Sequence, residues 1–247
     1  MAELVYDSER VKLWCGDAAE VLPTYKTECF DLVVTDPPYG VEFVSDMRSK
    51  ETRFAEIHND GRDEEARVVV CGILEQCVRL VGQNRHLYVF GPEVLRELLD
   101  AKVSNPAELI WVKQDGPGMG DLTAPWGPQH EKLHFYTSMH RHAGKRGKEN
   151  NPVRLRKGSV LKAVKPTGLS VRHPTEKPLA LLRELVESSS KVGEVVLDPF
   201  AGVGSTGVAA VLAGRRAVLC ELDEKYCEIA LERIKKAEKL AVEASML

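Results

Sequence analysis

The fold is decided by the stretch VVLDPFAGVGSTG at residues 195–207. An apolar, β-rich run leads into it, and residues 205–213 have the composition of a helix. Between the two lies a G-x-G-x-x-G pattern, whose glycines let the backbone of a strand-to-helix turn approach a bound ligand closely. No lysine follows the glycines, so the stretch is not the phosphate-binding loop of nucleotide hydrolases.

Two acidic residues near this turn indicate what it binds. Glu221 ends the next expected strand, where a carboxylate can accept hydrogen bonds from ribose hydroxyls, so the pattern predicts a cofactor that contains adenosine. Asp198 stands directly before the turn, where its charge would repel a pyrophosphate but suits the ammonium and sulfonium groups of S-adenosylmethionine. The alternative role for Asp198 is to cap the turn before Pro199.

A second motif, TDPPYG at residues 35–40, follows the β-rich run FDLVVT. Pro37 and Pro38 remove two backbone donors and fix two φ angles, which leaves nearby carbonyl groups as acceptors beside the Asp36 carboxylate. Two acceptors on the hydrogens of an exocyclic base amine favour its attacking form, and Tyr39 offers a surface on which a flipped base can stack. The alternative is a rigid turn without chemistry.

Strands and helices alternate on both sides of these motifs. We expect strands over residues 11–15, 30–35, 87–90, 108–112, 132–137, 194–197 and 217–221. We expect helices over residues 17–22, 63–80, 93–101, 179–188, 205–213 and 223–239. This order predicts an α/β fold with a mostly parallel sheet that helices cover on both faces.

Together the two motifs resemble those of the amino-group DNA methyltransferases, which methylate adenine N6 or cytosine N4. Placing the catalytic tetrapeptide before the cofactor turn is similar to the circularly permuted β group. Further agreement lies in WCGDAAEVL (14–22), RHLYVFGPE (85–93), ELIWVK (108–113), HPTEKP (173–178) and CELDEKYCEIALERI (220–234). The resemblance implies a Rossmann-like, seven-stranded S-adenosylmethionine-dependent methyltransferase fold. It also implies a catalytic half over 1–140 and a cofactor-binding half over 173–247 of the same domain.

The resemblance also assigns residues. The catalytic residues would be Asp36, Pro37, Pro38 and Tyr39. The contacts to S-adenosylmethionine would be Asp17, Asp36, Thr175, Lys177, Asp198, Phe200, Gly202, Gly204 and Glu221. We expect direct methyl transfer, because no cysteine in a Pro-Cys setting lies near Asp36 to attack a base. Of the two amines, adenine N6 is favoured over cytosine N4, because the cytosine enzymes more often carry serine at the first motif position.

The charge of the chain is uneven. The formal net charge is −3, yet residues 141–172 carry ten lysines and arginines and one acid, Glu149. Such a segment on an acidic body indicates a polyanionic partner, with a solvated basic loop as the alternative. We therefore expect 141–172 to be a DNA-contacting, target-recognition insertion, short for this group. The expected contacts to double-stranded DNA are Arg48, Arg53, Arg154, Arg156 and Lys157.

Composition limits the other possibilities. The chain has 247 residues, 43% of them hydrophobic and 29% charged, which is typical of a globular protein. No apolar run approaches the ~20 residues that span a bilayer, and residues 1–7 lack a basic stretch followed by an apolar one, so we expect no signal peptide. Six scattered cysteines without a C-x-x-C pair indicate a reducing compartment, so we expect a cytoplasmic protein with no membrane partner. Candidate partners are a second copy of the chain, in a homodimer, and a cognate restriction endonuclease. The sequence does not decide on either.

Three rival interpretations remain. Residues 130–134 spell H-E-x-x-H, the zinc-protease signature, but their setting favours a strand, on which the two histidines would lie about 13 Å apart. We therefore expect no metal. The glycine pattern alone is also compatible with an NAD-dependent oxidoreductase. A catalytically inactive nucleic-acid-binding protein is the third, and the intact Asp36–Tyr39 motif disfavours it.

Overall fold

The computed structural model describes residues 1–38, 64–91, 103–113, 125–127, 129–138, 157–164 and 176–245. Its strands are β1 (Glu3–Asp7), β2 (Val11–Cys15), β3 (Phe30–Thr35), β4 (Val81–Phe90), β5 (Val103–Val112), β6 (His130–Ser138), β7 (Val160–Lys162), β8 (Val195–Asp198) and β9 (Arg216–Glu221). Its α-helices are α1 (Ala18–Val21), α2 (Glu64–Leu80), α4 (Leu179–Ser189), α5 (Ser205–Leu212) and α6 (Glu224–Ser245). A short 3-10 helix, η1 (Leu22–Thr24), follows α1.

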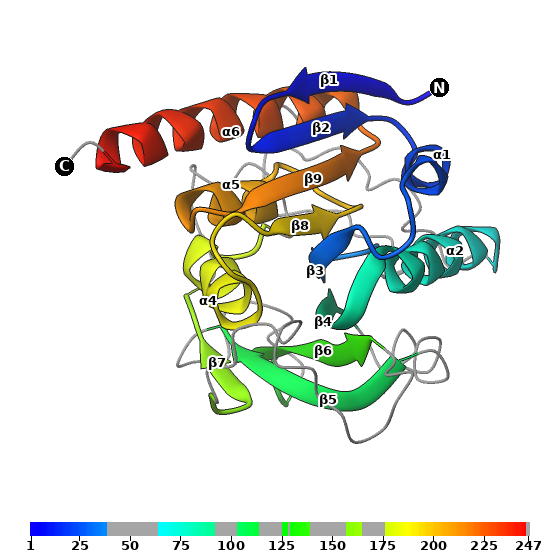
Figure 1. Ribbon diagram of the computed structural model, residues 1–247. Coiled ribbons are helices and arrows are strands. Elements are labelled where there is room, and N and C mark those ends of the chain that lie inside the picture. Colours follow the sequence, from blue (N-terminus) through cyan, green and yellow to red (C-terminus); the bar gives the residue numbers. More distant parts are fainter. Residues whose placement is uncertain are drawn as a thin grey trace.

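All these strands form one sheet in the order β1-β2-β9-β8-β3-β4-β6-β5-β7 (Figure 1). The central neighbours β2, β9, β8, β3 and β4 run parallel to one another. The antiparallel neighbours are β1 with β2, β4 with β6, and β5 with β6. Because β8 and β9 lie between β2 and β3, strands from both ends of the chain build the same core.

The mostly parallel α/β sheet with helices on both faces is confirmed, but it has nine strands where we expected seven. The two additional strands lie at its edges. Among the described strands, β1 pairs only with β2. Its residues alternate between exposed and partly exposed, so it lacks the buried apolar positions from which a strand is predicted in a sequence. β7 is three residues long, lies within the basic segment and pairs with β5.

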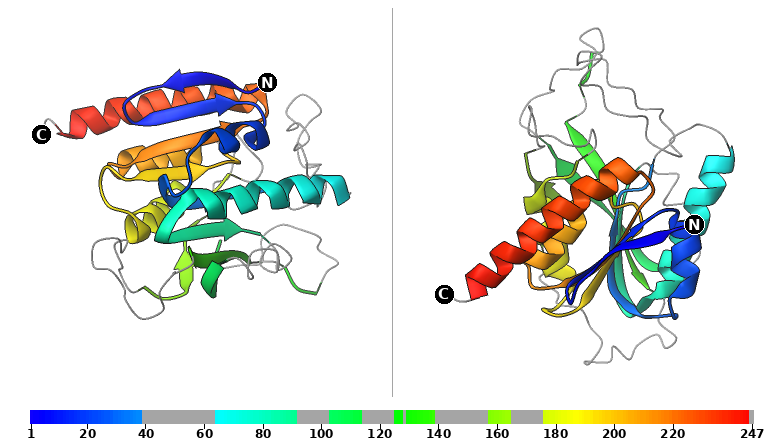
Figure 2. Two further views of the ribbon diagram at one scale, coloured as in Figure 1. Left: turned by 45° about the vertical axis from the view of Figure 1, so that its right-hand side comes forward. Right: turned by 90° about the horizontal axis from the view of Figure 1, so that it is seen from above.

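Helices α4, α5 and α6 cover one face of the sheet, and α1 and α2 cover the other (Figure 2). The central strand β3 is buried on both faces, which explains its nearly continuous apolar sequence. The expected strands and helices are otherwise found with small shifts in their ends, except that β4 and β5 begin five or six residues earlier and α6 ends six residues later. The helix expected over 93–101 lies outside the described residues.

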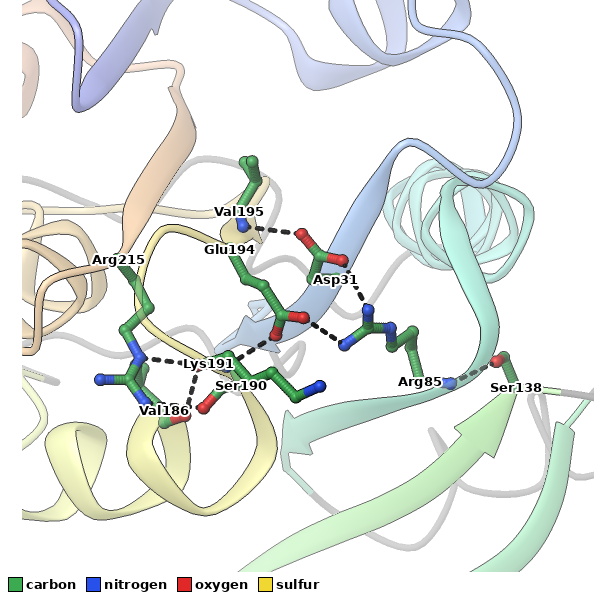
Figure 3. A network of polar contacts seen from close by, with 9 residues as sticks. All are labelled: Asp31, Arg85, Ser138, Val186, Ser190, Lys191, Glu194, Val195 and Arg215. Carbon is green, nitrogen blue, oxygen red and sulfur yellow. Dashed lines mark hydrogen bonds and ion pairs between the residues drawn. The ribbon is translucent and has the colours of Figure 1, made fainter. Parts of the chain in front are cut away.

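A polar network ties the strands together near the amino ends of β3 and β8 (Figure 3). The Arg85 guanidinium contacts Asp31 Oδ1 at 3.1 Å and Glu194 Oε1 at 2.8 Å. Asp31 Oδ2 accepts a hydrogen bond from the backbone N–H of Val195 at 2.9 Å, which joins β3 to β8. Asp36 and Asp198 lie at the opposite, carboxyl ends of these strands, where open α/β sheets bind their ligands.

Candidate active site

The catalytic turn begins where β3 ends. Thr35 is buried, and Asp36, Pro37 and Pro38 follow it out of the sheet, while Tyr39 lies outside the described residues. Because neither proline has an N–H, the turn cannot continue the ladder to β4 and β8. Asp36 therefore lies beyond the carboxyl end of β3.

Asp36 is held by a buried lysine. Lys177 Nζ donates to Asp36 Oδ2 in an ion pair, although the two residues are 141 positions apart in the chain. The Lys177 side chain is only 6% exposed and its Nζ lies 4.9 Å from the centre of the Phe90 ring. The resemblance assigns Lys177 to the cofactor; in this structure its ammonium contacts the Asp36 carboxylate.

A second carboxylate, that of Glu131 on β6, lies beside the same lysine. Its Oε2 is 3.5 Å from Lys177 Nζ, and its Oε1 is 3.3 Å from Lys113 Nζ. The sequence drew attention to Glu131 only as the second residue of H-E-x-x-H. Lys113 appeared only as the last residue of ELIWVK (108–113), because its contact with Glu131 on β6 cannot be read from that stretch.

That H-E-x-x-H pattern lies on strand β6, as its setting predicts. His134 is buried, with Nε2 3.0 Å from the carbonyl oxygen of Gly91, whereas His130 is exposed. Within the described ranges, no group of three or more histidine, cysteine or acidic side chains is placed to bind a metal. The zinc-protease geometry, with both imidazoles on one helix face, is thus not present.

Asp198 links the cofactor strand to the catalytic strand. Its Oδ1 accepts hydrogen bonds from Thr35 Oγ1 at 2.9 Å and from the backbone N–H of Phe200 at 3.1 Å. The bond to Phe200 caps the turn around Pro199. Burial raises the pKa of Asp198 to about 6, against hydrogen bonds that lower it. Through Thr35, the residue also fixes the backbone directly before Asp36.

The glycine turn leads from β8 into α5. Gly202 and Gly204 have φ angles of 52° and 75°, in the left-handed region that favours glycine. A Cβ on Gly204 would lie 2.9 Å from Cβ and 3.2 Å from Cα of Ala230 on α6, so no side chain fits there. The turn can therefore pass close to α6 only as glycine.

Glu221 lies directly against this turn at the end of β9. Its Oε2 accepts the backbone N–H of Gly202 at 2.7 Å, and its Oε1 accepts that of Asp223 at 2.9 Å. Burial raises the pKa of Glu221, against these backbone hydrogen bonds. A carboxylate offers about four lone-pair positions, and the backbone N–H of Leu222 also lowers the pKa of this one by hydrogen bonding, so about one position remains to accept a ribose hydroxyl.

Asp17 lies next to Glu221 because Gly16 N–H donates to the Glu221 carbonyl oxygen at 2.7 Å. Its side chain caps α1 by accepting from Ala19 N–H. The carboxyl-end edge of the sheet thus carries acidic acceptors after β2 and at the end of β9, together with the glycine turn at the end of β8. This arrangement fits the adenosine part of S-adenosylmethionine.

The remaining predicted residues are placed only in part. Thr175, Arg48, Arg53, Arg154 and Arg156 lie outside the described residues. Phe200 is described and packs against the apolar core under α2. Lys157 is described, and its Nζ lies 3.0 Å from Glu184 Oε1 on α4. None of the helices in the described part of the chain is long and apolar enough to cross a membrane.

Comparison with known proteins agrees with this geometry. The DNA methylase family N6_N4_Mtase matches residues 30–232. The type II methyltransferase M.HinfI of Haemophilus influenzae is 28% identical over 244 residues, which cover 90% of this chain and 67% of that protein. A solved structure described as a DNA modification methylase from Thermus thermophilus has a TM-score of 0.64 and 25% identity, covering 92% of this chain and 95% of that one.

The fold is also shared with the cytosine-N4-specific PvuII DNA methyltransferase. The TM-score is 0.65 with 13% identity, over 94% of this chain and 91% of that one. The family match spans most of the chain and decides against an oxidoreductase or a metalloprotease. The protein therefore belongs to the DNA methylase family of S-adenosylmethionine-dependent amino-group methyltransferases.

Proposed function

We propose that this protein transfers a methyl group from S-adenosylmethionine to N6 of adenine at specific sites in double-stranded DNA. The observation that carries the proposal is Asp36, presented at the end of β3 and held by the buried Lys177. The carboxylate is thereby fixed at the edge of the sheet that also carries the glycine turn and Glu221. An acceptor for the target amine and a site for the cofactor thus lie along the same edge.

The chemistry requires a better nucleophile than an aromatic amine. The nitrogen lone pair is delocalised into the base, so it attacks only when the amine becomes pyramidal. The acceptors that we assign to the amine hydrogens are the Asp36 carboxylate, which Lys177 holds, and a carbonyl group of the proline turn. Both acceptors gain strength as positive charge develops on the nitrogen, so they stabilise the transition state more than the ground state.

When bound, S-adenosylmethionine supplies an electrophilic methyl group on its sulfonium. The residues that we assign to it are Asp17, Gly202, Gly204 and Glu221, with Phe200 beside the turn. We propose direct transfer without a covalent bond between enzyme and base. In support, burial raises the pKa of both Cys77 and Cys220 above that of an ordinary thiol, which disfavours the thiolate that such a bond requires.

Adenine is the proposed base because aspartate occupies position 36, where the cytosine enzymes more often have serine. Cytosine N4 is the second candidate, since a cytosine-specific enzyme shares the fold. By analogy with the type II methyltransferase M.HinfI, we place the reaction in a restriction–modification system with a cognate endonuclease. Gel filtration with light scattering tests whether the protein forms a homodimer.

The test is transfer of labelled methyl groups to duplex DNA. The wild-type protein should label DNA but not RNA, whereas Asp36→Ala should be slower by about 100-fold or more while still binding S-adenosylmethionine. The matched control is Asp31→Ala at the opposite end of β3, which should keep its activity per folded molecule. An unlabelled DNA would support the inactive DNA-binding protein, and an Asp36→Ala variant within a few-fold of wild type would contradict the assigned site.

A further inference from the structure

Glu131 lies where three elements meet. It is the second residue of β6, and it pairs with Trp111 in the register of β5. Lys113 directly follows β5, and its backbone N–H donates to the Gln129 carbonyl oxygen at 2.8 Å, which fixes it opposite the start of β6. Lys177 reaches the same point from the segment before α4. Three elements that are separate in the sequence thus bring their charges together beside Asp36.

The four charged groups form an alternating chain. Asp36 contacts Lys177, Lys177 contacts Glu131, and Glu131 contacts Lys113. Their side chains are between 6% and 26% exposed, so water screens these interactions less than those of surface pairs. Two carboxylates and two ammonium groups give the chain no net charge.

Lys177 stands between Asp36 and Glu131 in that chain of contacts, so Glu131 helps to fix the position of the Lys177 ammonium. The lysine carries a flexible four-carbon stem, and an ammonium group donates up to three hydrogen bonds without a preferred direction. Two carboxylates in contact with Nζ define its position better than one. The Phe90 ring adds a third neighbour, with its centre 4.9 Å from Nζ.

We propose that Glu131 is a positioning residue for methyl transfer: it holds the Lys177 ammonium against Asp36, so that the catalytic carboxylate keeps its orientation and its local charge balance. This inference rests on the proposed function, and it concerns a residue outside the two motifs. Glu131 contacts neither the base nor the cofactor in this account. It acts only through Lys177.

Removing the Glu131 charge has a calculable direction. In Glu131→Gln, two ammonium groups face one carboxylate, so the cluster carries one excess positive charge. The target amine gains positive charge in the transition state, and the excess charge near Asp36 opposes it. The loss should fall on kcat, because the cofactor contacts at Glu221 and the glycine turn are untouched. A second change, Lys113→Met, removes the excess charge again.

The experiment compares kcat, KM for S-adenosylmethionine and DNA, and melting temperature for five proteins. They are the wild type, Glu131→Gln, Glu131→Asp, the double variant Glu131→Gln with Lys113→Met, and the control Glu108→Gln. Glu108 forms a cross-strand pair with Lys132 at 2.8 Å on the same two strands, but away from Lys177. It therefore reports the cost of losing a β5–β6 ion pair alone.

We expect Glu131→Gln to lower kcat by about tenfold with KM for S-adenosylmethionine within about twofold, as for the loss of one charge-assisted contact. The double variant should recover at least a third of that loss in kcat on a logarithmic scale. The kcat of Glu131→Asp should lie between those of Glu131→Gln and wild type. The kcat of Glu108→Gln should match that of wild type. A Glu131→Gln variant with the kcat of Glu108→Gln overturns the inference, as does a double variant no faster than Glu131→Gln.

Three further outcomes are decisive. A merely structural role would lower the melting temperature and leave kcat per folded molecule unchanged, which also overturns the inference. Should Glu131→Gln fail to fold, Glu131→Asp decides: a kcat equal to that of wild type contradicts positioning, and a lower kcat with unchanged KM supports it. If the wild type itself labels no DNA, the proposed function fails, and that result is distinct from every outcome for the variants.

Discussion

At the scale of single residues, Asp198 is the most constrained carboxylate of the site. It is 3% exposed, and its hydrogen-bond partners in the described part of the chain are the hydroxyls of Thr35 and Thr206 and the N–H of Phe200. These partners are neutral, so ionisation costs more here than in water, which is why its pKa rises to about 6. In return, the charged form holds the turns before Asp36 and after β8 in place.

A pH dependence of stability follows from that shift. The pKa of Asp198 is higher in the folded than in the unfolded chain, so its contribution to stability is greatest below about pH 4 and declines as the pH rises through about 6. Asp198→Asn does not ionise. We therefore expect its free energy of unfolding, relative to that of wild type, to be higher at pH 7.5 than at pH 4 by about 2–3 kcal/mol. Urea unfolding at the two pH values measures this difference. A constant offset at both would contradict it.

Glu221 is the residue whose loss should weaken cofactor binding most directly. Glu221→Ala removes the proposed ribose acceptor, so the affinity for S-adenosylmethionine should fall by ~1.5–3 kcal/mol. The side chain also holds the backbone of Gly202, and Glu221→Gln is the control because it keeps one acceptor oxygen. Isothermal titration decides; unchanged affinity in Glu221→Ala, or tighter binding of NAD than of S-adenosylmethionine to the wild type, would contradict the assignment.

At the scale of elements, the glycine turn and α2 predict opposite effects of the same substitution. Gly204→Ala would place a Cβ against the α6 backbone at a φ of 75°, which should cost about 1–3 kcal/mol of unfolding free energy. Gly72 is exposed within α2, and a Cβ added there would meet nothing within 4 Å, so Gly72→Ala should gain about 0.5–1 kcal/mol. Denaturant unfolding of both variants tests this, and equal signs would contradict the described packing.

The elements that carry the motifs could be read from the sequence because their signals are local. FDLVVT followed by two prolines, and the run before the glycines, each predict a strand that ends in a turn, and both are present. β1 and β7 could not be predicted, because an edge strand depends on its neighbour more than on its own residues. The pairing of Asp36 with Lys177 and of Lys177 with Glu131 is likewise tertiary, since the partners lie on different elements.

At the scale of the whole molecule, the uneven charge bears on DNA binding. We propose that the basic segment 141–172 contacts phosphates, because such contacts outnumber base contacts and the segment is short. Lys157 is the one proposed DNA contact of this segment that the structure describes. Its ammonium lies 3.0 Å from Glu184 Oε1, which partly neutralises its charge. Arg154 and Arg156 should therefore contribute more to DNA affinity than Lys157.

The salt dependence of DNA affinity tests that proposal. Binding should weaken with a log–log slope of about −0.9 for each phosphate neutralised. Replacing Arg154, Arg156 and Lys157 together should flatten the slope by about two to three units and leave S-adenosylmethionine affinity unchanged, whereas replacing Lys157 alone should change it by less than about one. An unchanged slope in the triple variant would refute the placement of this segment and leave the family assignment intact.

The central claim, methylation of adenine N6 in DNA, is tested most directly by identifying the product. Mixed-sequence duplex DNA is incubated with S-adenosylmethionine and the wild-type protein or Asp36→Ala, digested to nucleosides and analysed by mass spectrometry. We expect N6-methyladenine from the wild type. The yield from Asp36→Ala should be lower by about 100-fold, because Asp36 acts mainly in the transition state. N4-methylcytosine as the sole product, or equal yields of N6-methyladenine from both proteins, would contradict it.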